Sequence, residues 1–452
     1  MIGYENMKQI LERALKASTA EQTEVMIIAQ DTQLTRFANN YIHQNVAEAD
    51  AIMNVRAVMG KRQGMATTNN LSAEGVEEAI EVARSAALKQ PEDPNFPGLV
   101  AAPPSQPIAA LDEETAFCRP NERAKAVGII CRKAKEKNTN SSGYFRTGMV
   151  ETAIANSLGT LSYHIGSVAD ISVTAMTDDS AGRAQQSAWK LNELIPDELG
   201  DEAIDKADRG RNPRKIDPGE YTVVVEPYVT DDLIGSLAWI GMDALAVQEE
   251  RSWMNDRIGK QAMSPLVSIW DDGRALTGYP LPFDYEGVPK QPIRIVERGI
   301  IGSPIYDTYT AHREGKPSTG HAIPRSMARF GIGPFPFNLF MAGGENTIDE
   351  MIQSTQRGLY IATFWYTRPM HPRDAVITGM TRDGVFMIED GQVAYPVKNL
   401  RFTQSYVDAL ANVEMVGRET RLFVGEFDSG INIASRVPAL KISTFSFTGS
   451  TV

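Results

Sequence analysis

The sequence predicts an α+β protein, with helix-plus-β-meander units in its N-terminal half and a largely antiparallel, β-rich domain in its C-terminal half. Three observations support this class. The first 90 residues combine two amphipathic helical patterns with strands of alternating polarity. Residues 108–215 return to the same kind of pattern. The rest of the chain holds many strand patterns separated by glycine-containing turn signals.

The first unit opens with an amphipathic helix. Its apolar positions are Met7, Ile10, Leu11, Ala14 and Leu15. Short strands are expected next, at EVMIIAQ, QLTRFANNYIHQNV and ADAIMNVRAVMG, and GKRQG (60–64) predicts a turn. Ser72 then stands at the N-cap of a second helix. The apolar face of that helix consists of Val76, Ala79, Ile80 and Ala83.

A proline-rich connector precedes the second unit. Residues 91–107 hold six prolines and no periodicity, which is typical of an extended linker. A helix is expected at about residues 121–137, and strands resume after it. The stretches ANNYIHQNVAEADAIMNVRAVMGKRQG and ANSLGTLSYHIGSVADISVTAMTDDSAGRAQ share an Ala-Asn start, a histidine (His43 and His164) and a Gly/Arg turn. This similarity suggests a duplication, although matches this loose also arise by chance.

The best domain boundary lies near residues 213–218, where a polar segment gives way to the apolar strand YTVVVEP. We therefore expect an N-terminal domain of residues 1–215, with subregions 1–90 and 108–215, and a C-terminal domain of residues 216–452. Residues 231–261 are expected to form one long helix, and residues 346–358 a second helix. Hairpin turns are expected at DDG (271–273), ERG (297–299), TRDG (381–384) and EDG (389–391).

Charge and composition limit the classes of partner that the chain is expected to bind. The chain has 452 residues, with 45 Lys plus Arg against 57 Asp plus Glu, for a formal charge of -12. An acidic chain without a dense basic run would repel a phosphate backbone, so no nucleic-acid partner is expected. Two cysteines, Cys118 and Cys131, suggest a reducing compartment. No signal peptide or membrane-spanning run is visible, so we expect a soluble, cytoplasmic protein with no membrane partner.

Common site motifs are missing from the sequence. It contains no Walker loop, no dinucleotide-binding glycine motif and no G-x-S-x-G elbow. The five histidines are His43, His164, His312, His321 and His371, and no two lie three to five residues apart. A helix therefore cannot present two imidazoles on one face, and a metal site would need ligands from separate segments.

Two polar groupings are weak candidates. Glu249 and Glu250 are adjacent, so they point about 100° apart on a helix and do not form a catalytic pair. Because Arg251 and Lys260 are nearby, a solvated helix end with ion pairing is favoured. Ser318 and His321 lie in the polar loop GKPSTGHAIP, where turn formation is favoured over a hydrolase triad, because a triad is a spatial arrangement.

Several stretches together resemble the TldD/PmbA family, whose members are also labelled modulators of DNA gyrase. They include TRFANNYIHQN, GKQAMSPLVSIW followed by DDG, PFDYEGVPKQPIRIVERGII, KPSTGHA and EDGQVAYPVKNLRF. These landmarks occur in order from about residue 35 to residue 445, so the resemblance covers nearly the whole chain.

The resemblance implies a zinc peptidase system that acts on unstructured peptides. TldD carries His-Glu-x-x-x-His on a helix at the head of its C-terminal domain, with a later cysteine, and pairs with a PmbA (TldE) partner that lacks the motif. In this chain the motif positions run from Gly235 and Ser236 to Ile240, and the cysteine position falls near Asp428 or Ser429. The resemblance therefore implies a PmbA/TldE-like chain with no cofactor of its own and with zinc in a TldD-like partner.

Three functions remain open from the sequence. The first is a non-catalytic TldE-like subunit, paired with a TldD-like subunit or with itself, that serves a peptidase acting on unfolded peptides. The second is an active peptidase or amide hydrolase with relocated ligands such as His321, Asp428 or Glu249. The third is a homodimeric peptide-binding scaffold that accepts an extended peptide as an added strand.

Overall fold

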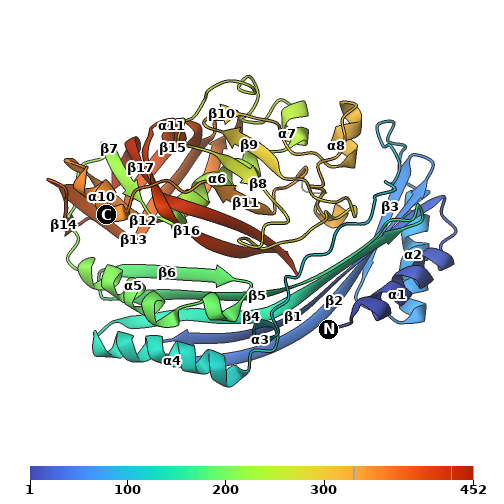
Figure 1. Ribbon diagram of the computed structural model, residues 1–452, viewed down its shortest axis with the longest axis horizontal. Coiled ribbons are helices and arrows are strands. Elements are labelled where there is room, and N and C mark those ends of the chain that lie inside the picture. Colours follow the sequence, from blue (N-terminus) through green and yellow to red (C-terminus); the bar gives the residue numbers. More distant parts are fainter. Residues whose placement is uncertain (329–330, 429, 451–452) are drawn as a thin grey trace.

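The chain is built on two β-sheets, one in each half of the sequence. The computed structural model describes residues 1–328, 331–428 and 430–450. Within these ranges, the N-terminal half forms a six-stranded sheet and the C-terminal half an eleven-stranded sheet. The first sheet is a long curved layer, and the C-terminal domain lies against one of its faces (Figure 1). The expected α+β class is confirmed.

The N-terminal sheet contains two units of the same design. The first comprises α1 (Tyr4–Ala17), β1 (Gln22–Ala38), β2 (Tyr41–Met59), β3 (Arg62–Thr68) and α2 (Ala73–Ala87). The second comprises α3 (Glu113–Ala116), α4 (Pro120–Glu136), β4 (Asn140–Asn156), β5 (Leu161–Met176), β6 (Ala181–Ala188), a 3-10 turn η1 (Leu191–Glu193) and α5 (Pro196–Arg209). The strand order is β3-β2-β1-β4-β5-β6, with β1 and β4 antiparallel at the centre. The expected repeat of a helix and a meander is therefore present.

The strands of the first unit are longer than expected. β1 and β2 run for 17 and 19 residues, so the prediction of several short strands was wrong. Asn39 and Asn40 have φ values of 53° and 61°, and they reverse the chain in a tight turn between the two strands.

The predicted cap at Ser72 is confirmed, because its hydroxyl accepts a hydrogen bond from the Gly75 amide at 3.2 Å.

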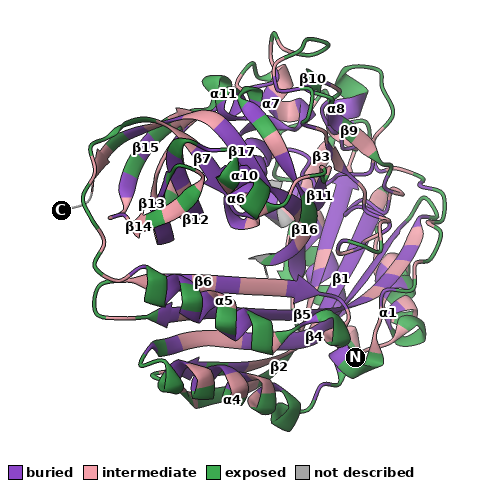
Figure 2. Cartoon of the chain, turned by 60° about the vertical axis from the view of Figure 1, so that its left-hand side comes forward, coloured by how far each residue is buried: buried purple, intermediate pink, exposed green. Residues whose placement is uncertain are grey.

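The apolar run in β1 is buried on both of its faces. Val25 and Ile27 pack with α1 and α2, whereas Met26 and Ile28 belong to the core of the C-terminal domain. Because side chains alternate along a strand, one short run can serve two cores. Figure 2 shows the exposed residues concentrated on the outer sides of helices such as α4 and α5, away from the buried strands.

The C-terminal domain begins with a strand that leads into its central helix. Its elements are β7 (Gly219–Val225), α6 (Pro227–Gly241), α7 (Ala244–Gln248), β8 (Ile269–Asp271), β9 (Ile293–Glu297), β10 (Ile300–Ile301), α8 (Thr308–Arg313), α9 (Arg325–Ala328), β11 (Asn338–Met341), α10 (Ile348–Gln353), β12 (Arg357–His371), η2 (Pro372–Asp374), β13 (Val376–Glu389), β14 (Gln392–Pro396), β15 (Leu400–Ser405), α11 (Tyr406–Ala411), β16 (Val413–Asp428) and β17 (Ile431–Ser450).

Strand pairing in this domain is largely antiparallel, as expected. The pairs β7–β12 and β11–β17 are parallel. β17 pairs with both β15 and β7, so β7, β12, β13, β15 and β17 close into a ring. α6 packs against β12 and β17, and its buried apolar residues belong to the main core of the domain.

The prediction of one long helix over residues 231–261 was wrong. α6 ends at Gly241, whose φ of 150° is a conformation that other residues rarely adopt. The Asp243 carboxylate accepts a hydrogen bond from the Ala246 amide at 2.9 Å and so starts the short α7. The chain then folds back, and the Trp253 indole donates to the Leu237 carbonyl at 2.9 Å. No described helix has the length and apolarity needed to span a membrane.

Two of the four expected hairpins are present. Residues 297–299 and 389–391 connect β9 to β10 and β13 to β14. The other two predictions were wrong: residues 381–384 form an irregularity inside β13, where Asp383 and Gly384 have positive φ, and residues 271–273 end β8 before a loop. Around residues 346–358, the expected helix is shortened to α10 because β12 begins at Arg357.

Candidate functional site

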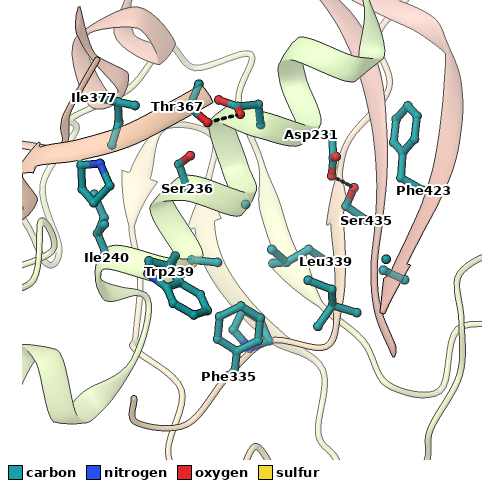
Figure 3. A pocket seen from close by; sticks show the side chains of 18 residues that line it. Asp231, Ser236, Trp239, Ile240, Phe335, Leu339, Thr367, Ile377, Phe423 and Ser435 are labelled. Atoms are coloured by element: carbon teal, nitrogen blue, oxygen red, sulfur yellow. Dashed lines mark hydrogen bonds between the residues drawn. The ribbon is translucent and has the colours of Figure 1, made fainter. Parts of the chain in front are cut away.

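One face of α6 lines a cavity of about 430 Å³. The other walls come from the loop before β11, from β12 and β13, and from the β16–β17 hairpin (Figure 3). The lining residues include Asp231, Asp232, Gly235, Ser236, Trp239, Ile240, Phe335, Leu339, Thr367, Ile377, Phe423 and Ser435. Segments from residue 231 to residue 435 therefore meet at one place.

The helical period explains which part of α6 faces the cavity. Residues three or four positions apart share a helix face, so Asp231, Gly235 and Trp239 follow one another along it. Leu233 and Leu237 point the other way and are fully buried in the core. Pro227 at the first helical turn and Gly241 at the end limit this face to a short, well-defined stretch.

Two carboxylates mark one end of the cavity. The Ser435 hydroxyl donates a hydrogen bond to Asp231 (Figure 3). Asp232 accepts hydrogen bonds from the Tyr406 hydroxyl and the Thr367 hydroxyl, each at 2.7 Å. Among the side chains that the structure describes, neither carboxylate forms an ion pair with a basic residue.

Burial raises the pKa values of both carboxylates. The pKa of Asp231 rises to about 6; the Ser435 hydrogen bond opposes this shift, whereas the nearby charge of Asp232 adds to it. Burial also raises the pKa of Asp232, against the effect of hydrogen bonds from Tyr406 and Thr367. Raised pKa values of this kind are common in binding and catalytic sites, because low-dielectric surroundings penalise an unpaired charge.

Aromatic side chains form the other end of the cavity. Trp239 is 51% exposed, and its ring meets that of Phe335 edge to face at a centroid distance of 6.2 Å (Figure 3). Phe335 in turn packs edge to face on Phe337 at 5.7 Å. A second cavity of about 400 Å³ shares Trp239 and Phe335 with the first, and it is also lined by Asp243 and Arg251. The aromatic pair thus separates two adjoining hollows.

The family models match nearly the whole chain. Residues 23–87 match PmbA/TldA metallopeptidase domain 1, residues 108–211 the central domain and residues 218–449 the C-terminal domain. The chain belongs to the PmbA/TldD metallopeptidase family. The resemblance inferred from the ordered sequence motifs is therefore confirmed.

Named relatives of this PmbA/TldD family member come from both branches of the family. A metalloprotease TldD homolog of Haemophilus influenzae is 22% identical over 89% of this chain and 87% of the relative. A metalloprotease PmbA homolog of the same organism is 25% identical over 80% of each chain. The crystal structure of TldE from Thermococcus kodakarensis superposes with a TM-score of 0.86 at 19% identity, covering 98% of this chain and 100% of that one. These similarities establish the family fold.

The positions to which the family resemblance assigns the zinc motif lie at the cavity. Gly235, Ser236 and Ile240 all line it. Zinc in proteins is held by cysteine sulfur, histidine nitrogen or carboxylate oxygen. Glycine and isoleucine offer no such atom and serine offers one neutral hydroxyl, so these three positions do not fit a zinc ion. Elsewhere in the described chain, no three His, Cys, Asp or Glu side chains gather in a way that could hold a metal.

The position that the family resemblance assigns to the late zinc ligand falls at the end of β16. Ser429 lies outside the described residues, and of Asp428 the structure describes only the backbone, at the end of β16. Gly425 on β16 and Ile433 on β17, which are paired across this hairpin, line the cavity.

The other sequence candidates lie away from the cavity. His321 is fully buried, with its Nε2 atom 3.0 Å from an Asp271 carboxylate oxygen and its Nδ1 atom 2.9 Å from the Thr319 hydroxyl. Glu249 follows α7 and forms an exposed ion pair with Arg251 at 2.7 Å. Neither His321 nor Glu249 lines the cavity.

Sequence reasoning missed the two carboxylates and the aromatic end of this site. Asp231, Asp232 and Trp239 belong to the same predicted helix as Gly235. Asp231 and Trp239 each lie four residues from Gly235, a spacing that places them on the helix face of Gly235 and could have indicated their role. Phe335, Thr367 and Ser435 had no such signal, because they come from three distant segments that meet only in the folded chain.

Proposed function

We propose that this chain is a non-catalytic, TldE-like subunit of a metallopeptidase that acts on unfolded peptides. The observation that carries the proposal is the face of α6. This face presents Gly235, Ser236 and Ile240, the positions that the family resemblance assigns to the zinc motif, to a cavity of about 430 Å³. A hydrogen atom, a hydroxyl and a hydrocarbon cannot replace two imidazoles and a carboxylate as zinc ligands and general base.

The surroundings of α6 support a binding role. The cavity lies within the size range of about 300–1,000 Å³ that is usual for ligand pockets, and most of its wall is apolar with a few polar groups. Gly235 leaves open space, because a Cβ added there would meet no atom within 4 Å. In the proposed complex, the TldD-like partner supplies zinc and the hydrolytic step, and this chain contributes binding surface for the peptide.

Co-expression tests the subunit role. The chain should be produced with a His-Glu-x-x-x-His homologue from the same genome, with an affinity tag on one chain only. The proposal predicts a stable hetero-oligomer that cleaves unfolded casein and is inhibited by EDTA, whereas this chain alone cleaves nothing. A tagged chain that purifies without the homologue in both tagging directions would count decisively against the proposal.

A further inference from the structure

The cavity on α6 combines two features that single out a ligand class. One end, the acidic end, holds the carboxylates of Asp231 and Asp232, which are half-buried residues. The other end, the aromatic end, holds the rings of Phe335, which is buried, and Trp239, which is exposed. Asp231 and Trp239 are eight residues apart on one helix, which is about 12 Å along the axis at 1.5 Å per residue. The cavity is therefore long and has chemically different ends.

At the acidic end, none of the described side chains supplies a positive charge next to the carboxylates. No described basic side chain is within ion-pair distance of either carboxylate; Arg183 on β6 acts on Asp231 only from farther away. The hydroxyls of Ser435, Tyr406 and Thr367 hold the two carboxylates in place. A buried carboxylate without a basic partner is costly, and an incoming cation would relieve that cost.

The aromatic end of the cavity suits the apolar part of a cationic ligand. Aromatic faces attract cations and also pack against the aliphatic stems of basic side chains. Leu339 and Ile433 add hydrocarbon to the wall of the cavity. The overall charge of -12 also favours the approach of a cationic ligand over an anionic one.

We propose that this cavity binds an organic cation with an apolar flank, as presented by a Lys or Arg side chain or by the free amino terminus of an unfolded peptide. The carboxylates receive the cationic head, and Trp239 and Phe335 cover the part of the peptide at the mouth. The inference rests on the proposed function for its ligand class, peptides, but the binding belongs to this chain and needs neither zinc nor a partner.

Calorimetric titration of the full-length chain tests this specificity. The probes are the blocked peptide acetyl-Ser-Gly-Leu-Arg-Gly-Ser-amide, its Arg→Gln counterpart, and the Gln peptide with a free amino terminus. The variants are Asp231→Asn and Asp232→Asn, which keep the shape of each side chain. Asp205→Asn on the exposed face of α5 is the matched control. Urea unfolding of each variant verifies that it is folded.

The native chain is expected to bind the Arg peptide about tenfold or more tightly than the blocked Gln peptide. Each cavity variant should lose most of that preference, and Asp205→Asn should keep it. Tighter binding of the unblocked Gln peptide, lost in the same variants, would identify the amino terminus as the source of the cation.

Equal affinity for all three peptides, a preference that survives both cavity variants, or no binding at all would overturn the inference. Because the isolated chain is titrated, these outcomes are independent of the co-expression result. If the chain prefers the Arg peptide but does not co-purify with the homologue, the subunit role is wrong and the cation-binding cavity is still supported.

Discussion

Asp231 has its carboxyl group at the acidic end of the cavity, where burial raises its pKa to about 6. A carboxyl whose pKa is higher in the folded than in the unfolded state binds its proton more tightly when folded. Its contribution to stability is therefore complete below about pH 4 and is lost as the pH rises through 6. At neutral pH the charge of Asp231 destabilises the chain, which is consistent with a residue kept for binding.

Asp231→Asn should accordingly stabilise the chain at neutral pH. Asn cannot ionise and still accepts the hydrogen bond from Ser435, so the variant escapes the cost of a buried charge. We expect its gain in unfolding free energy over the native chain to be about 2 kcal/mol larger at pH 7.5 than at pH 4.5, because the buried carboxyl of the native chain ionises between these two pH values. Urea denaturation at the two pH values measures this difference.

The exposed Asp205→Asn variant provides the comparison, since its carboxylate lies on the outer face of α5. It should show no such change between the two pH values. An Asp231→Asn gain that is the same at both pH values would mean that burial does not raise the pKa of Asp231.

At the scale of the element, the length of α6 is set by contacts at its C-terminal end. The Ser252 hydroxyl donates to the Gly241 carbonyl, and the chain after α7 packs back over the end of the helix. A Cβ on Gly241 would lie 2.7 Å from the Ser252 Oγ atom, and the φ of 150° is strained for any other residue. Because the chain folds back at this point, α6 ends at Gly241, and the helix face that lines the cavity ends with it.

Two glycine substitutions in α6 should therefore have opposite effects. Gly241→Ala should destabilise the chain by about 2 kcal/mol or more, through steric overlap and backbone strain. Gly235→Ala, in the middle of the same helix with open space around its Cβ, should stabilise it by about 0.5–1 kcal/mol. Equilibrium unfolding of both variants gives the comparison. Equal stability of Gly241→Ala and the native chain would contradict this account of the helix end.

The helix end also shows where prediction from sequence failed. Apolar periodicity continues past Gly241, so the pattern alone predicted one helix to residue 261. Glycine inside a helical pattern is tolerated often enough that it gave no warning. The deciding contacts, from Ser252 and Trp253, depend on the chain folding back and are not local.

At the scale of the whole molecule, a buried charged network joins the two domains. Lys206 on α5 donates to Glu226, immediately before α6, at 2.6 Å and to Glu202 at 2.7 Å. Although burial lowers the pKa of Lys206, the charges of Glu226 and Glu202 raise it above its usual value. Arg421 on β16 binds both carboxylate oxygens of Glu202. α5 thereby helps to set the position of α6, the helix that lines the cavity.

The general architecture was accessible from the sequence for a physical reason. Local periodicity and turn chemistry specify elements, and a repeated order of elements specifies the two N-terminal units. The candidate site was accessible only in part. Gly235, Ser236 and Ile240 were found through family resemblance, but the hydroxyls that bind Asp231 and Asp232 lie between 135 and 204 positions away in the chain. Contacts over such separations leave no trace in a single sequence.

The central claim is that this chain completes a family peptidase without holding the metal. The most direct test is the zinc content of the full-length chain, purified alone after exposure to zinc and measured by elemental analysis. We expect well under 0.1 zinc per chain at protein concentrations of about 10 μM, because Gly235, Ser236 and Ile240 supply no usual zinc ligand. One zinc per chain, together with EDTA-sensitive cleavage of unfolded casein by the chain alone, would contradict the account.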